Sequence, residues 1–131
     1  GNGATTQRNY PAAFKGDIPD MTRITTHILD TSLGQPAANV RVWLERVEGQ
    51  NITLLSETQT DADGRAAKLT PEPVASGHYR LCADIGAYFT ATGRETLYHS
   101  AIIDVVIDGE QDHYHLPLLV SPYSYSTYRG S

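Results

Sequence analysis

Residues 23–30 read Arg23-Ile24-Thr25-Thr26-His27-Ile28-Leu29-Asp30, and their side chains alternate with a period of two. The even-numbered positions carry Ile, Thr and Ile on one face, whereas the odd-numbered positions place Thr25, His27 and Leu29 on the other. Successive side chains of an extended strand point to opposite faces of a sheet. The stretch therefore predicts a β-strand that ends at Asp30 and Gly34.

Short segments of the same kind fill the rest of the chain. We predict further strands at residues 40–45, 52–58, 79–84, 101–107, 112–120 and 123–128, and one short helix at residues 88–95. Gly49-Gln50-Asn51 and Asp61-Ala62-Asp63-Gly64 have the composition of tight turns. Short strands with a turn signal about every ten residues predict an all-β sandwich.

The composition predicts one domain and argues against two classes of partner. The chain has 131 residues, which is enough for a single hydrophobic core. Its net charge is −5 and it contains no run of Lys and Arg, so nucleic acid is not an expected partner. No apolar run approaches the ~20 residues that a membrane-spanning helix needs, so we expect no membrane partner either.

Cys82 is the single cysteine of the chain. The sequence therefore predicts no disulfide within the chain, and it leaves the compartment, cytoplasm or periplasm, undetermined. Because Cys82 alternates with apolar neighbours in a predicted strand, we expect a small buried side chain rather than a reactive thiol.

Residues 1–21 differ from the rest of the chain. They are mostly small and polar, and Pro11, Gly16 and Pro19 interrupt any regular pattern. We expect a flexible N-terminal extension or linker over residues 1–21, followed by one domain over residues 22–131.

Asp61, Asp63 and Glu72 have part of the spacing of a calcium-binding loop. An EF-hand loop places its glycine at the sixth position, whereas Gly64 stands at the fourth position counted from Asp61. We therefore predict an Asx turn, in which the Asp61 side chain accepts hydrogen bonds from its own turn.

The chain contains five histidines, which raises the question of a zinc site. His113 and His115 are two residues apart on a predicted strand, so both project from one face about 7 Å apart. A metal could bridge that distance if His27, on a separate strand, supplied a third ligand. A pair of surface side chains is the ordinary explanation. His78 and His99 lie at the edges of predicted elements, where we expect them to be solvated.

The chain ends in Tyr128-Arg129-Gly130-Ser131, an unusual concentration of hydrogen-bonding groups. These residues supply a phenol, a guanidinium, a hydroxyl and the terminal carboxylate. They lie at most ~50 Å of extended chain from His113 and His115. A strand that folds back beside these histidines would bring a base and several hydrogen-bonding groups together.

Taken together, several stretches resemble one known family. They are Ile24–Asp30 with Gly34 and Pro36-Ala37, then Thr60–Arg65, and finally His113–Ser131. The chain resembles the 5-hydroxyisourate hydrolases, the transthyretin-related enzymes of purine degradation, over about residues 22–131. The terminal Tyr-Arg-Gly-Ser is specific, because the hormone-carrying transthyretins lack it. Tyr98-His99-Ser100 departs from the aromatic-aromatic-proline sequence that is more common in the family.

The resemblance implies a fold, an assembly and a site. The fold would be a transthyretin-like (prealbumin-like) β-sandwich of two four-stranded sheets with one short helix. Four subunits would assemble as a dimer of dimers, a homotetramer paired through its sheet edges. The catalytic residues would be His27, Arg65, His115 and Ser131, and the substrate-binding residues would be Tyr128, Arg129, Gly130 and His113.

The implied reaction is the hydrolysis of 5-hydroxyisourate to 2-oxo-4-hydroxy-4-carboxy-5-ureidoimidazoline, through cleavage of the lactam C6–N1 bond. His115 and His27 would orient and deprotonate the attacking water, since a base with a pKa near neutrality suits this role. Arg65 would hold the carbonyls of the substrate and stabilise negative charge. No cofactor is expected, and zinc at His27, His113 and His115 would be adventitious.

Two alternative functions stay open at this point. One is a transthyretin-like carrier of a small ligand, against which the polar histidines and the arginine argue. The other is a zinc-dependent hydrolase that uses His27, His113 and His115 with an open fourth position on the metal.

Overall fold

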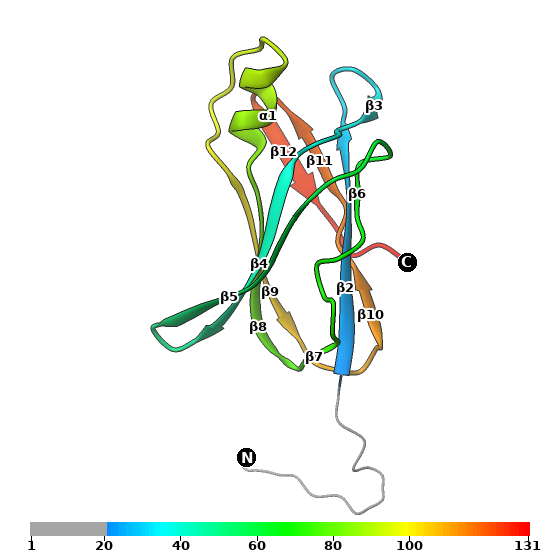
Figure 1. Ribbon diagram of the computed structural model, residues 1–131, viewed down its shortest axis with the longest axis vertical. Coiled ribbons are helices and arrows are strands. Elements are labelled where there is room, and N and C mark those ends of the chain that lie inside the picture. Colours follow the sequence, from blue (N-terminus) through cyan, green and yellow to red (C-terminus); the bar gives the residue numbers. More distant parts are fainter. Residues whose placement is uncertain (1–20) are drawn as a thin grey trace, which may run out of the picture.

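The computed structural model describes residues 21–131, which form two β-sheets and one short helix (Figure 1). The extension predicted over residues 1–21 lies outside this range except for Met21, which begins the first described strand. The elements are β2 (Met21–Asp30), β3 (Gln35–Pro36), β4 (Arg41–Glu48), β5 (Asn51–Gln59), β6 (Arg65–Ala66), β7 (Val74–Ala75), β8 (Gly77–Ala83), α1 (Ile85–Ala91), β9 (Ala101–Ile107), β10 (His113–His115), β11 (Leu118–Ser121) and β12 (Ser124–Thr127).

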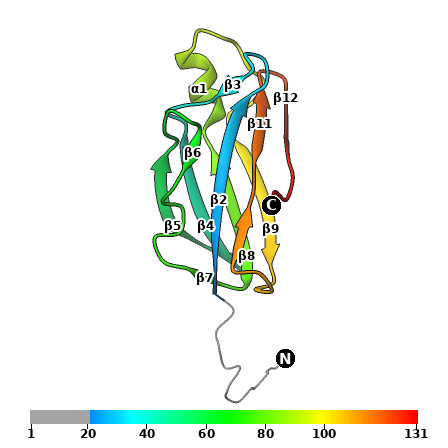
Figure 2. The same ribbon diagram turned by 90° about the vertical axis from the view of Figure 1, so that its right-hand side faces the viewer.

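The two sheets pack face to face and lie as two layers in Figure 1, whereas Figure 2 looks onto the face of the sheet that contains β2. One sheet has the order β5-β4-β8-β9 with antiparallel pairing throughout. The other has the order β10-β2-β11-β12, and the two-residue strands β3, β6 and β7 also pair with β2. This confirms the predicted all-β sandwich with one short helix. Strand β2 is the organising strand of the site, because most of the second sheet pairs with it.

The alternation predicted for β2 is confirmed. Its even-numbered side chains are buried, and its odd-numbered side chains are half-buried or exposed. The buried side chains of both sheets and α1 form one core, to which the largest contributors are Ile24, Ile28, Leu44, Leu69, Tyr79, Leu81, Ile85, Phe89 and Leu118. Burial of a large aliphatic or aromatic side chain stabilises a fold by roughly 1.5–3 kcal/mol. Because the even-numbered side chains of β2 belong to the core, the odd-numbered face is the one available for a functional site.

The strand predicted over residues 112–120 is interrupted, which corrects the prediction. Strand β10 ends at His115 and β11 begins at Leu118, with Leu116 and Pro117 between them. Proline has no amide hydrogen to donate to a sheet ladder. The chain nevertheless stays beside β2, because the Leu116 amide donates to the Thr25 carbonyl at 2.9 Å.

The helix lies earlier than predicted, at Ile85–Ala91 instead of residues 88–95. The Asp84 carboxylate caps it by accepting a hydrogen bond from the Ala87 amide, a common role of aspartate at a helix start. It ends before Gly93, whose φ of +77° is left-handed. The prediction overlooked the Asp84 cap and read through the terminating glycine.

A buried ion pair ties the end of β2 to the segment after α1. The Asp30 carboxylate is fully buried and accepts hydrogen bonds from Arg94 at 2.6 Å, Tyr88 at 2.7 Å and Ser32 at 2.7 Å. Burial alone would raise the pKa of Asp30, but these hydrogen bonds outweigh it and hold the pKa well below its ordinary value. The carboxylate is thus charged and fully partnered inside the protein.

Several smaller predictions can be compared directly. Cys82 is buried as predicted, and burial raises the pKa of its thiol to about 11. His99 is exposed as predicted. His78 is the second residue of β8, close to the predicted element edge, but its ring contacts the Asp104 carboxylate and is half-buried, which corrects the expectation that it is solvated. Within residues 21–131, no helix is long and apolar enough to cross a membrane.

Candidate functional site

The site begins on the odd-numbered face of β2. Thr25 and His27 are half-buried there, whereas Thr26 between them is buried in the sandwich. In the antiparallel pairing of β2 with β6, His27 lies directly opposite Arg65. Cross-strand neighbours on one face stand about 4.5–5.5 Å apart at their Cβ atoms. The structure therefore brings these two predicted catalytic residues together.

The turn at residues 61–64 contacts β2 and holds the Arg65 backbone opposite His27. The Asp61 carboxylate accepts hydrogen bonds from the Asp63 amide at 2.9 Å and the Arg65 amide at 3.0 Å, so the predicted Asx turn is confirmed. Gly64 lies against β2, where its carbonyl accepts a hydrogen bond from the Ile28 amide at 2.8 Å. A Cβ at Gly64 would stand 2.4 Å from the Ile28 carbonyl oxygen, and its φ of +77° also favours glycine. The Asp-Ala-Asp-Gly turn thus positions Arg65 beside β2.

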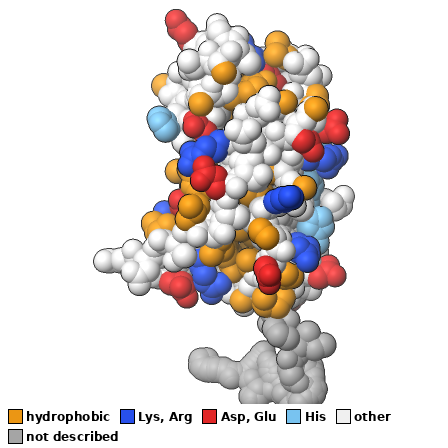
Figure 3. All heavy atoms as spheres, in the orientation of Figure 1, with side chains coloured by type: hydrophobic (Ala, Val, Ile, Leu, Met, Phe, Trp, Pro, Cys, Tyr) orange, Lys and Arg blue, Asp and Glu red, His pale blue; other side chains and the backbone are white. Residues whose placement is uncertain are grey.

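Strand β10 brings two histidines to the same face from the other direction. It runs parallel to β2, with His113 opposite Arg23 and His115 opposite Thr25. Tyr114 between them is buried, so both imidazoles project from the face that carries His27. The ring centroids of His113 and His115 are 6.3 Å apart. Figure 3 shows histidine and basic side chains together on the side of the molecule where β2 and β10 lie.

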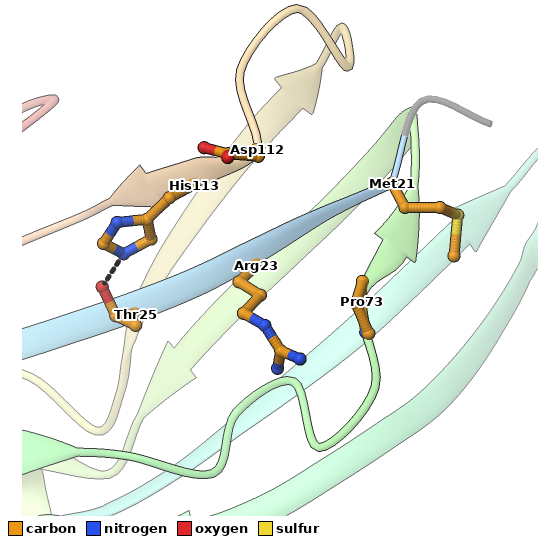
Figure 4. A pocket seen from close by; sticks show the side chains of 6 residues that line it. All are labelled: Met21, Arg23, Thr25, Pro73, Asp112 and His113. Atoms are coloured by element: carbon orange, nitrogen blue, oxygen red, sulfur yellow. Dashed lines mark hydrogen bonds between the residues drawn. The ribbon is translucent and has the colours of Figure 1, made fainter. Parts of the chain in front are cut away.

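Thr25 joins the two imidazoles, a role that the sequence analysis did not assign. Its Oγ1 lies 2.7 Å from His113 Nε2 and 2.9 Å from His115 Nδ1. Figure 4 shows the first of these hydrogen bonds. The signal that could have found Thr25 is its position two residues before His27 on the same face of one strand. What the sequence could not supply is the register of β10 beside it.

The C-terminal tail folds back onto His115, as the sequence predicted. Strand β12 pairs antiparallel with β11, and the chain then reaches a bridge between Gly130 and His115. The Gly130 amide donates to the His115 carbonyl at 2.8 Å. A Cβ at Gly130 would stand 2.8 Å from His115 Cδ2 and 3.2 Å from Pro117 Cγ. Only a residue without a side chain fits this approach without displacement.

The other tail residues take different positions. Tyr128, Arg129 and Ser131 are exposed. Among the described residues their side chains have no hydrogen-bond partner. The positive charge of Arg129 does act on Asp108, whose pKa is lowered mainly by a hydrogen bond from Tyr114 and to a smaller extent by this charge. The backbone of Gly130 is therefore the part of the tail that the structure brings into contact with His115.

The electrostatic environment of His115 favours its neutral form. Burial lowers the pKa of the imidazole below its ordinary value, and the neighbouring His113, Arg65 and His27 lower it further. The three residues that lower the pKa of this one ring lie on three different strands, β10, β6 and β2. A neutral imidazole next to a guanidinium suits proton abstraction at a site that also stabilises negative charge.

A cavity of about 490 Å³ adjoins the His113 side of this face (Figure 4). It is lined by Met21, Arg23, Thr25, Pro73, Asp112 and His113. The Arg23 guanidinium points away from His113 and donates to the Thr70 carbonyl at 3.1 Å. The cavity therefore borders the group of His27, Arg65 and His115 without containing it.

The zinc hypothesis gains no support from the geometry. Within residues 21–131, no three side chains of the His, Cys, Asp or Glu type are arranged to hold a metal ion. His113 Nε2 and His115 Nδ1 are both hydrogen-bonded to the hydroxyl of Thr25.

Comparison with known proteins gives a consistent result. The model of the HIUase/Transthyretin family matches residues 24–130. The 5-hydroxyisourate hydrolase of Caulobacter vibrioides is 46% identical over 115 residues, which cover 85% of this chain and 100% of that protein. The structure of Klebsiella pneumoniae 5-hydroxyisourate hydrolase is 45% identical in sequence to this chain and superposes with a TM-score of 0.74. The match covers 84% of this chain and 94% of the Klebsiella chain. Sea bream transthyretin in complex with thyroxine is 30% identical with a TM-score of 0.76, over 82% and 93% of the two chains. The chain belongs to the HIUase/Transthyretin family.

Proposed function

We propose that this protein is a hydrolase that converts 5-hydroxyisourate to 2-oxo-4-hydroxy-4-carboxy-5-ureidoimidazoline. The observation that carries the proposal is the gathering of His27, Arg65 and His115 on one face, with the Gly130 backbone bridged to His115. Relatives named 5-hydroxyisourate hydrolase match this chain over most of their length. The carrier and zinc-dependent alternatives are not favoured by any of these observations.

His115 is the general base of the proposed reaction. Its ring is half-buried and neutral at neutral pH, because burial and three positively charged or chargeable neighbours lower its pKa. It takes a proton from water as the oxygen attacks the C6 carbonyl of the substrate. His27 orients the same water from β2, and the proton is returned to N1 when the C6–N1 bond breaks.

Arg65 stabilises the negative charge that develops on the substrate. The guanidinium is planar and fixed in charge, and it presents paired N–H donors that match adjacent carbonyl oxygens. Its backbone amide donates to the Asp61 carboxylate, which holds the residue opposite His27. His113 binds the substrate from the edge of the same face.

The tail completes the substrate pocket. Gly130 lets the backbone approach His115, and the exposed side chains of Tyr128 and Ser131 are free to bind a polar purine derivative. Ser131 contributes a hydroxyl. Arg129 anchors the tail through its charge, which acts on Asp108.

The functional assembly we propose is a homotetramer, a dimer of dimers. Strand β9 ends the order β5-β4-β8-β9, so one of its edges has no partner strand among the described residues. Ile102 and Val106 on this strand are 54% and 80% exposed. An open edge with apolar side chains is suited to pairing with the same strand of a second copy, and β12 is the end strand of the other sheet.

The direct test is the ultraviolet decay of 5-hydroxyisourate, freshly generated by urate oxidase, with and without this protein. The proposal expects decay much faster than the spontaneous rate, and unchanged after pretreatment of the protein with EDTA. Decay that stops after chelation would support metal catalysis in its place. A rate equal to the spontaneous rate would refute the hydrolase assignment.

A further inference from the structure

Thr25 lies at the centre of the site, yet the proposed chemistry gives it no task. Its hydroxyl lies between the rings of His113 and His115, at 2.7 Å from Nε2 of the first and 2.9 Å from Nδ1 of the second. Both distances are those of hydrogen bonds. One hydroxyl therefore connects the proposed base to a second, more exposed imidazole.

A threonine hydroxyl has one proton to donate and two lone pairs to accept with. It can donate to only one of two neutral rings, and it then accepts from the N–H of the other. If His115 donates from Nδ1, its Nε2 carries a lone pair. If His115 accepts at Nδ1, its Nε2 carries the proton and cannot act as a base. The direction of the hydrogen bond between Thr25 and His115 therefore determines whether His115 Nε2 can act as a base.

We propose that Thr25 is a positioning residue that holds His115 in its Nδ1–H tautomer and leaves the Nε2 lone pair for the attacking water. The inference rests on the proposed hydrolase function. Thr25 then donates its own proton to Nε2 of His113, which carries its ring proton on Nδ1. When His115 takes a proton from water at Nε2, its Nδ1–H already points at an acceptor, so no hydroxyl has to turn during the reaction.

One feature of the site fixes the ring orientation that this assignment requires. The opposite edge of the ring is confined, because Cδ2 lies where a Cβ on Gly130 would approach to 2.8 Å. A flipped ring would turn a carbon toward the hydroxyl and lose the hydrogen bond.

The usual orienting partner of a catalytic imidazole, a carboxylate, does not take this role here. Within residues 21–131, no aspartate or glutamate is hydrogen-bonded to the rings of His113 or His115. Asp112 lines the neighbouring cavity. The Thr25 hydroxyl is therefore the side-chain group that can set both tautomers.

The experiment compares the wild-type protein with Thr25→Val and Thr25→Ser. Valine keeps the branched shape suited to a strand but removes the hydroxyl, whereas serine keeps the hydroxyl. Thr31→Val serves as a matched control, because it removes a hydroxyl that donates to the Val120 carbonyl beyond the end of β2. Thermal unfolding of each variant confirms that it folds.

The first readout is the nitrogen-15 chemical shift of the imidazole nitrogens at a pH where His115 is neutral. We expect a protonated Nδ1 and an unprotonated Nε2 in the wild type, Thr25→Ser and Thr31→Val, and a proton shared between both nitrogens in Thr25→Val. The second readout is kcat/KM for 5-hydroxyisourate, which we expect to fall about ten-fold in Thr25→Val, the scale of one hydrogen bond. Thr25→Ser and Thr31→Val should stay within about two-fold of wild type, a difference of roughly 0.4 kcal/mol.

An Nε2-protonated His115 in the wild type, or an unchanged tautomer in Thr25→Val, would overturn the inference. The shift measurement needs no substrate. A wild-type protein without hydrolase activity would therefore overturn the proposed function, while the nitrogen shifts alone would still decide whether Thr25 sets the tautomer.

Discussion

The close approach of the tail to His115 makes Gly130→Ala a sensitive test of the site. The new Cβ would stand 2.8 Å from His115 Cδ2, about 0.6 Å inside the 3.4 Å at which ordinary contact begins. It would also press on Pro117 at 3.2 Å and 3.3 Å. Because the proline ring is stiff, we expect the tail and the imidazole to separate by roughly that 0.6 Å.

A displacement of this size should lower the catalytic rate strongly but change the stability of the fold little. A misplacement of about 1 Å can cost about 10²-fold in rate, so we expect kcat/KM to fall roughly 10- to 10²-fold. The free energy of unfolding should change by less than about 1 kcal/mol, because the tail at Gly130 contributes little to the core. The assay pairs initial rates of 5-hydroxyisourate decay with urea unfolding at one protein concentration.

Gly34→Ala is the matched control, for which we expect a loss of stability but no loss of activity. Gly34 has a φ of +69° and open space around its Cβ position, far from the tail in the sequence. Alanine there should reduce stability by about 1 kcal/mol through backbone strain and leave kcat/KM unchanged. Wild-type activity in a folded Gly130→Ala variant would refute the reasoning that the tail must approach His115.

Further outcomes follow from the site and the core. His115→Ala should lower kcat/KM by about 10²- to 10⁴-fold with the fold intact, as measured by the decay assay and circular dichroism. Because burial and neighbouring charges lower the pKa of His115 below 6.5, the base form persists at acidic pH, and kcat/KM should fall only as the pH drops through this lowered value. Arg65→Gln should move this acidic limb to higher pH, since the substitution removes one of those charges, and a limb that stays in place would argue against the assignment. Arg94→Met leaves the Asp30 carboxylate buried without its ion-pair partner and should reduce stability by about 3–5 kcal/mol. Loss of the exposed pair of Arg41 with Glu57 should reduce stability far less in the same unfolding assay, because solvent screens it, and equal losses would contradict this ranking.

The sequence was most informative where local patterns decide structure. The alternation around His27 predicted β2 and the division of its side chains between two faces, because the period of a strand is local. The Asp61 turn was predicted for the same reason. The break at Pro117 was missed although proline is a visible signal, since the apolar residues around it continue the pattern of a strand.

The parts that depend on tertiary pairing were harder to predict. Strands β3, β6 and β7 have two residues each, too few for a period, and they exist because β2 offers them an edge. The family resemblance indicated His27, Arg65 and His115, but no spacing in the sequence shows that Arg65 faces His27. Thr25 was missed because its importance comes from the parallel register of β10 with β2.

The measurement that tests the central claim most directly is the fate of the water oxygen. Freshly generated 5-hydroxyisourate is hydrolysed in water labelled with oxygen-18, with and without this protein, and the product is analysed by mass spectrometry. Attack of water on the C6 carbonyl predicts one labelled oxygen in the product carboxylate, formed at a rate that rises in proportion to the protein and falls in His115→Ala. Unlabelled carboxylate, or labelled product formed no faster than without the protein, would contradict the account.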